Sequence, residues 1–220
     1  MRFINIINAI SMTLLSTSSL TLWAGQRVGN GGFIVNCPNS PEVPVNGLHL
    51  LDYLDGELRF PALGKVNLPL DGDAESKARF VFERLKRVDP IRAEKYLAEL
   101  DHFFDPEITR FLPQGYRIPT AGDFGDTMTP TNCTIVQVVA NTIPTEPEEP
   151  KYWISQPLWD QLNEMVRAGL IIHEIVYNDA LLRGHSTSER ARYFTFLISS
   201  DKILTIDQKT YDERVLKNEL

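Results

Sequence analysis

Residues 163–184 read NEMVRAGLIIHEIVYNDALLRG, which has the periodicity of one continuous helix. The asparagine that opens the segment is a suitable N-cap, and the glycine that closes it is a natural C-terminal stop. One broad face carries Ile171, Ile172, Ile175, Val176 and Leu182. His173, Glu174 and Tyr177 gather on the other face between leucines, where ionisable side chains are costly to desolvate unless they are paired. This polar cluster needs either a structural or a functional explanation.

The rest of the chain combines strand and helix signals. All 14 prolines lie between Pro38 and Pro157, so we expect that part to be loop-rich and the last 63 residues to be mostly helical. Asp73 and the Asp89-Pro90 pair are start signals for two helices, over 74–88 and from 90 to about 104. Further strands are expected at 33–37, 47–53, 134–140 and 152–155. Two further helices are expected, one that follows the capping box at 186–189 and runs to 199, and one that is capped by Thr210 and runs to 216.

These elements predict an α+β fold. Short N-terminal strands and two mid-chain helices are expected to pack on a mostly helical C-terminal half. About 200 residues are enough for one sizeable hydrophobic core, so residues 25–220 are expected to form a single globular domain. We interpret the acidic, proline-rich segment 144–150 as an exposed loop of that domain rather than a linker.

Residues 1–24 have the pattern of a secretory signal peptide. Arg2 supplies the positive charge, residues 4–22 are apolar or small, and Ala24 is small enough to precede the cleavage site. The strongly apolar part is shorter than the roughly 20 residues of a membrane span, although an uncleaved anchor is the alternative. We therefore expect a soluble periplasmic or secreted protein that has no stable membrane insertion after cleavage.

The charge balance excludes two classes of partner. Cleavage after Ala24 leaves 196 residues with 21 basic and 29 acidic side chains, a net charge of −8. No cluster of Lys and Arg is present to contact the phosphates of a nucleic acid. The sequence also lacks the polybasic patch that would hold a protein on anionic lipid.

Cys37 and Cys133 are the two cysteines of the chain. In an exported protein, an even number of cysteines most simply indicates a disulfide bond. Two independent buried thiols are the alternative.

Several short motifs together resemble a family of exported proteins of Gram-negative bacteria that has no assigned activity. The motifs are GNGG (29–32) with Cys37 shortly after, LLDYLDG (50–56), Asn132-Cys133 with Gln137, and HEIVY (173–177) followed by Ser188 and Arg192. The resemblance implies that the two cysteines belong together. It also implies that His173, Glu174, Tyr177, Ser188 and Arg192 form one cluster, but it supplies neither a reaction nor a fold.

One interpretation of the cluster is a metal site. A helical His-Glu-x-x-His motif binds zinc through its two histidines while the glutamate activates water. In this chain Tyr177 replaces the second histidine, and a phenol is a poor zinc ligand at neutral pH. His185 could complete the ligand set by folding back from beyond the helix end. This interpretation predicts a zinc-dependent, peptidase-like hydrolase with His173 as a ligand and Glu174 as the general base.

The other interpretation is a buried structural network. Glu174 would pair with Arg190 or Arg192 on the next helix, while His173 and Tyr177 bind backbone or side-chain groups. This interpretation, which we favour, predicts a non-catalytic exported protein with a binding or envelope-associated role. It assigns no catalytic residue, no metal ligand and no cofactor. Zinc is expected only under the hydrolase alternative.

Overall fold

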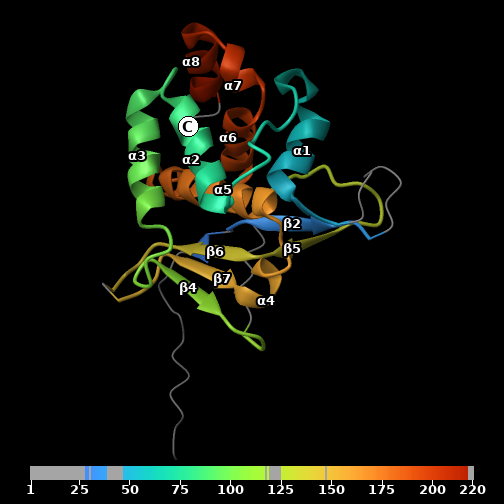
Figure 1. The fold of residues 1–220 in the computed structure, drawn as a ribbon, viewed down its shortest axis with the longest axis vertical. Helices are drawn as coiled ribbons and strands as arrows, with labels where there is room; N and C mark the ends of the chain where they lie inside the picture. The colour runs from blue at the N-terminus through green and yellow to red at the C-terminus, as the bar shows by residue number, and fades with distance from the viewer. Residues whose placement is uncertain are drawn as a thin grey trace, which may run out of the picture.

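The structure, a computed structural model, describes residues 28–29, 31–38, 47–116, 118, 125–146 and 148–217. The predicted signal peptide, residues 1–24, lies outside the described residues. In the described part, most of the helices form one side of the molecule, and two small β-sheets with the short helix α4 (Gln156–Trp159) form the other (Figure 1). The fold is therefore α+β with a mostly helical C-terminal half, as the sequence predicts.

The elements follow one another in mixed order along the described chain. The strands are β1 (Val28–Gly29), β2 (Phe33–Asn36), β3 (Leu48–Leu50), β4 (Thr109–Leu112), β5 (Thr134–Gln137), β6 (Val139–Thr142) and β7 (Tyr152–Ser155). The α-helices are α1 (Leu51–Arg59), α2 (Ala74–Leu85), α3 (Pro90–Asp101), α4 (Gln156–Trp159), α5 (Glu164–Leu182), α6 (Glu189–Ser199), α7 (Lys202–Thr205) and α8 (Gln208–Lys217). A short 3-10 helix covers Pro61–Leu63.

The two sheets are connected by residues 134–142, which contribute β5 to one sheet and β6 to the other. One sheet has the order β3-β2-β5 and is antiparallel, and the other has the order β1-β6-β7-β4, with β4 and β7 parallel. The continuous strand predicted over 134–140 is wrong, because the chain breaks at Val138 and its two halves join different sheets. At the break, the carbonyl of Gly32 accepts hydrogen bonds from the N–H groups of Val138 (3.0 Å) and Val139 (3.2 Å).

The predicted disulfide bond is confirmed, and it joins Cys37 to Cys133 across 96 residues of sequence. Cys37 directly follows β2 and Cys133 directly precedes β5, and these strands pair so that Asn36 lies opposite Thr134. The disulfide therefore closes one end of the three-stranded sheet.

Helices α2 and α3 begin as predicted. The Asp73 side chain accepts a hydrogen bond from the Ser76 N–H (2.8 Å), and Asp89 accepts one from the Arg92 N–H (3.1 Å). The apolar residues at helical spacing in both helices are buried in the core: Ala78, Val81, Phe82 and Leu85 of α2, and Ala93, Tyr96, Leu97 and Leu100 of α3. The predicted ends at 88 and about 104 are wrong, because the helices end at Leu85 and Asp101, and Phe104 is 40% exposed.

The segment 47–53 differs from its prediction as a strand. Only Leu48–Leu50 form β3, and the chain then turns directly into α1. Within this helix Gly56 lies against the ring of Phe196 on α6, so closely that a Cβ atom would overlap the ring. The close approach of α1 to α6 therefore requires glycine at this position, which the apolar pattern of the segment alone did not reveal.

The C-terminal helices confirm most of the predicted boundaries but not all of the caps. Asn163 caps α5 by accepting from the Val166 N–H (3.0 Å). Gly184, directly after the C-cap residue Arg183, stops the helix by adopting a φ of +91°. The predicted capping box at 186–189 is wrong, because α6 starts at Glu189 and its N-cap residue, Ser188, makes no side-chain capping bond. Asp207 rather than Thr210 caps α8, since its carboxylate accepts from the Thr210 N–H (2.8 Å).

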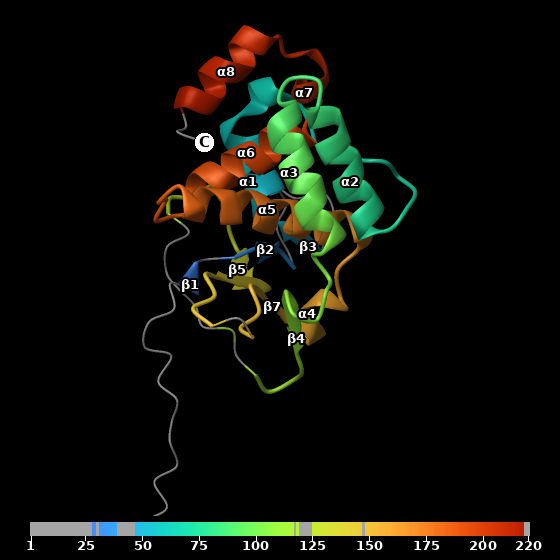
Figure 2. The ribbon, with the colours of Figure 1, turned by 90° about the vertical axis from the view of Figure 1, so that its left-hand side faces the viewer.

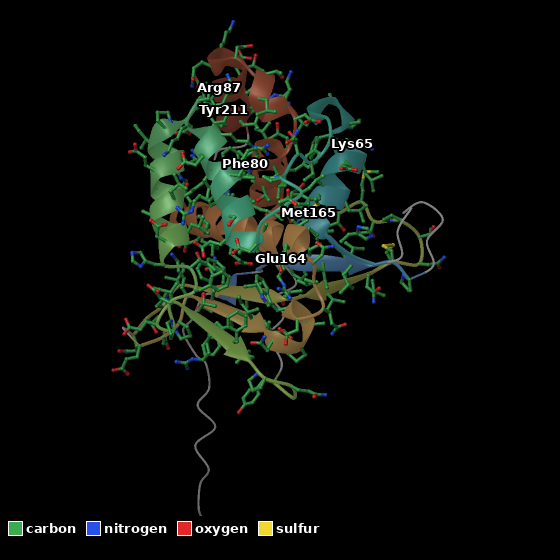
Figure 3. All side chains as sticks on the ribbon, in the orientation of Figure 1. Lys65, Phe80, Arg87, Glu164, Met165 and Tyr211 are labelled. Carbon is green, nitrogen blue, oxygen red and sulfur yellow. A yellow bond between two sulfur atoms is a disulfide. The ribbon has the colours of Figure 1, made fainter. Side chains whose placement is uncertain are left out.

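Helix α8 is held against the other helices by polar contacts at its start. Tyr211 donates to Asp89 (2.9 Å), and Arg87 donates to the carbonyl of Ile206 (2.7 Å) just before the helix. Figure 3 shows Arg87 and Tyr211 close together at the helical end of the molecule.

Helix α5 lies between the other helices and the sheets (Figure 1 and Figure 2). It contacts α1, α2, α3 and α6 on one side and β3 and β6 on the other. The main hydrophobic core is built around it and draws on both halves of the chain. Among the described helices, none is both long enough and apolar enough to cross a membrane.

Replacing both cysteines by serine is expected to lower the free energy of unfolding by about 4 kcal/mol, because the unfolded chain regains the freedom that a closed loop of 96 residues loses. Urea denaturation monitored by circular dichroism measures this change. A reductant should destabilise the wild-type protein and leave the double variant unaffected. A double variant as stable as the oxidised wild type would contradict the prediction.

Candidate functional site

The HEIVY segment lies on the most deeply buried part of α5. His173, Glu174 and Tyr177 are each fully buried, and the isoleucines around them are buried as well. The polar side chains therefore lie in apolar surroundings, as the sequence predicts, and the helix is enclosed on all sides over 168–181. Leu182, assigned to the aliphatic face, is instead 63% exposed at the helix end.

His173 pairs with a carboxylate from another helix. Its Nδ1 lies 2.6 Å from Oδ2 of Asp52 on α1, and both side chains are 1% exposed. Burial alone would lower the pKa of His173, but the negative charge and hydrogen bond of Asp52, together with the nearby Glu174, raise it above its ordinary value. The pair is thus a buried histidine–carboxylate contact that joins α5 to α1.

Glu174 binds the backbone rather than an arginine. Its Oε1 accepts a hydrogen bond from the N–H of Gly32, next to β2, while Asn141 on β6 donates to the Glu174 carbonyl (3.2 Å). Burial raises the pKa of Glu174 to about 7, against the opposing effects of His173 and the Gly32 N–H. The predicted pairing with Arg190 or Arg192 is wrong, since within the described chain the second carboxylate oxygen, Oε2, has no hydrogen-bond partner.

The glycines of the GNGG motif explain how the backbone reaches Glu174. A Cβ atom on Gly32 would overlap the side chain of Leu170, and one on Gly31 would overlap the backbone carbonyl of Val139. Gly31 therefore needs to be glycine, because backbone atoms of Val139 and Ala140 lie where its side chain would be, and Gly32 lets Leu170 of α5 pack closely against the backbone.

Ser188 and Arg192 lie around a different acid. The Arg192 side chain is 2% exposed, and its Nε lies 3.7 Å from Oδ2 of Asp55 on α1. Its other nitrogens donate to the Ser188 hydroxyl (3.2 Å) and to the carbonyl of Asp126 (2.8 Å). The five residues of the predicted cluster thus form two groups, and the ring of Tyr177 lies tilted against that of His173, with 5.7 Å between the ring centroids. Helix α1 connects the groups through Asp52 and Asp55.

The sequence analysis missed Asp52, Asp55 and Arg59, which all point from α1 toward the site. Asp55 accepts from the Met128 N–H (2.6 Å) and pairs with Arg59 (2.8 Å). Burial raises the pKa of Asp55, although the Met128 N–H, Arg192 and Arg59 oppose this. The signal was present in LLDYLDG: two aspartates three residues apart in an apolar segment lie on one face if that segment is a helix.

A cavity of about 620 Å³ opens beside these residues. Its wall comes from α1, from α6, from the connection between α5 and α6, and from the end of α8. The lining residues are Asp52, Asp55, Gly56, Arg59, Phe60, Arg183, Gly184, His185, Ser186, Thr187, Glu189, Arg190, Arg192, Tyr193 and Lys217. Asp52 thus belongs both to the buried pair with His173 and to the cavity wall.

The candidate zinc ligands lie in different surroundings. His185 belongs to the cavity wall, whereas His173 does not and its Nδ1 is paired with Asp52. Over the described ranges, no group of three or more His, Cys, Asp and Glu side chains is placed to hold a metal ion. The hydrolase hypothesis therefore has no ligand set in this part of the chain.

No protein-family model, curated protein sequence or solved structure matches the chain. The resemblance to exported proteins of Gram-negative bacteria accordingly stays a prediction.

The stability of the protein is expected to fall as the pH rises from about 4.5 to about 7. The folded state binds the proton of Glu174 more tightly than the unfolded chain does, because burial raises its pKa from 4.5 to about 7. The raised pKa of His173 acts in the same direction, since its contribution is present below pH 6.5 and is lost above the folded pKa. Urea denaturation at a series of pH values measures the decline.

The variant Glu174→Gln should lose most of this pH dependence. Glutamine still accepts from Gly32 but carries no charge to desolvate, so at pH 8 the variant should be more stable than the wild type by about 3 kcal/mol. Glu57→Gln, on the exposed side of α1, is the control and should keep the wild-type profile. An unchanged pH profile in Glu174→Gln would show that Glu174 is not the titrating group.

Proposed function

We propose that the protein is an exported binding protein whose cavity takes a small anionic molecule. The observation that carries the proposal is the charge of the cavity wall. Among the described residues, four arginines and one lysine line it, against three carboxylates: Arg59, Arg183, Arg190, Arg192 and Lys217, and Asp52, Asp55 and Glu189. In a protein with a net charge of −7, this is a local reversal of sign.

The ion pairs around the cavity leave its arginines able to bind a ligand. The single carboxylate of Asp55 contacts two guanidinium groups, those of Arg59 at 2.8 Å and Arg192 at 3.7 Å. Arg59 also contacts Asp126 (3.2 Å), and Arg183 contacts Asp179 (3.4 Å), but these two carboxylates lie outside the wall. Since a guanidinium has five N–H donors, a paired arginine can still bind a carboxylate or phosphate.

The size of the cavity and the charge of the protein point to a small ligand. A volume of about 620 Å³ lies in the range of sites that enclose small molecules. The overall negative charge repels nucleic acids and other large polyanions, while a small anion experiences mainly the local field of the wall. The disulfide supports the exported location, because such bonds persist in oxidising compartments.

The buried network around α5 holds the inner part of this wall in place. His173 and Asp52 connect α5 to α1, and Glu174 connects α5 to the backbone at Gly32. The network thus serves as the structural support of a binding site, in line with the non-catalytic interpretation of the sequence.

Two anions are expected to bind in preference to their neutral counterparts: glutarate over glutaramide, and 2-deoxyglucose 6-phosphate over 2-deoxyglucose. Isothermal titration calorimetry at low ionic strength measures the four affinities. The double variant Arg190→Gln/Lys217→Gln should bind both anions about tenfold more weakly, because two charged donors leave the wall.

The control is Arg79→Gln/Lys209→Gln, which removes the same charge from positions on α2 and α8 that lie outside the cavity wall. It should bind the anions as the wild type does. The proposal fails if neither anion binds, if the neutral compounds bind equally well, or if the control loses as much affinity as the cavity variant.

A further inference from the structure

We propose that the cavity recognises an amphoteric ligand, with an anionic group at the basic outer wall and an ammonium group that donates to Asp52 at the inner wall. This inference rests on the proposed function and specifies the ligand class of the same site. It would make the protein a receptor for compounds of the amino acid or amino sugar acid type rather than for simple anions.

Helix α1 sets the order of charges along the cavity. Asp52, Asp55 and Arg59 are spaced by three and four residues, so they share one face of the helix, and all three line the cavity. From Asp52 to Arg59 the helix advances about 10 Å. Exposure increases in the same direction, from 1% for the Asp52 side chain through 6% for Asp55 to 17% for Arg59. The inner end of this face is therefore acidic and the outer end basic.

Asp52 is the acid on this face that can still accept a hydrogen bond from a ligand. One carboxylate oxygen, Oδ2, is paired with His173 at 2.6 Å. The other, Oδ1, is buried and has no hydrogen-bond partner within the described ranges. A buried charged acceptor without a donor is costly, so a ligand N–H or O–H that reaches it gains a strong hydrogen bond.

Asp55 differs from Asp52, because its oxygens are already in use. Oδ1 accepts from the Met128 N–H (2.6 Å) and contacts Arg59 (2.8 Å), while Oδ2 faces Arg192 (3.7 Å). The two acids thus have separate roles: Asp55 holds the arginines of the wall, and Asp52 is left to contact a ligand.

His173 holds the Asp52 carboxylate in position from the side away from the cavity. It lies on the buried helix α5, outside the cavity wall, and its ring is held between Asp52 and the neighbouring Tyr177. An anionic group placed at the inner wall would meet this carboxylate and Asp55 at close range, which opposes binding. The anionic end of a ligand must therefore lie toward the outer wall, with its donor end inward.

Two pairs of compounds that differ by one amino group test the inference on the unmodified protein. L-Glutamate is compared with glutarate, and glucosamine 6-phosphate with 2-deoxyglucose 6-phosphate, by isothermal titration calorimetry at pH 6.5. We expect the amino compound of each pair to bind at least about tenfold more tightly, as for a charge-assisted hydrogen bond in a desolvated site. Equal affinities within both pairs would overturn the inference and leave the proposed function intact. If no anion binds, both fail.

The variant Asp52→Asn tests whether Asp52 causes the preference for the amino compounds. It keeps an acceptor oxygen but removes the charge, so the advantage of the amino compounds should fall to about threefold or less, while glutarate binds as well as before or better. Asp105→Asn, a change at an exposed acid, is the control and should keep the full preference. If Asp52→Asn folds and retains the preference, Asp52 is not the acceptor. If it does not fold, the comparison on the wild-type protein still decides whether the ligand is amphoteric.

Discussion

Glu174 is a carboxylate on the central helix that accepts a hydrogen bond from the backbone N–H of Gly32, and the placement of both sheets follows from this contact. The carbonyl of the same glycine accepts from Val138 and Val139, where the chain leaves one sheet and enters the other. A single backbone position thus connects α5, β2 and the β5–β6 junction. A side chain at this position would have to displace Leu170 of α5. The burial of a titratable group with a pKa near 7 is the cost of this arrangement.

Helix α1 connects that buried network to the cavity. Its first turn is anchored by the Asp52–His173 pair, its middle packs on α6 through Gly56, and its last turn presents Arg59 to the cavity. Buried ion pairs of this kind add little net stability, but they allow few alternative packings because each partner is costly to leave alone. The network therefore positions the cavity wall more than it stabilises the fold.

The cavity combines a fixed inner part with a more accessible outer part. Its inner residues, Asp52, Asp55 and Arg192, are nearly inaccessible to solvent and hold one another through several contacts. Its outer part comes from the α5–α6 connection and the end of α8, where side chains are more exposed. A preformed inner wall with an adaptable rim suits a small polar ligand, because little ordering is needed at the groups that decide specificity.

The sequence by itself determined the local features. The caps at Asp73, Asp89 and Asn163, the apolar stripes of α2 and α3 and the class of fold could be predicted, because each depends on residues a few positions apart. The disulfide was predictable from cysteine count and the expected export. Only the tertiary structure decided the rest: the parallel strand β4, the break at Val138, the helix that carries Asp52, and the backbone partner of Glu174. These features depend on segments that are distant in the sequence, such as the paired strands β4 and β7 or the residues Gly32 and Glu174. No local pattern shows which buried polar groups will meet when such segments pack.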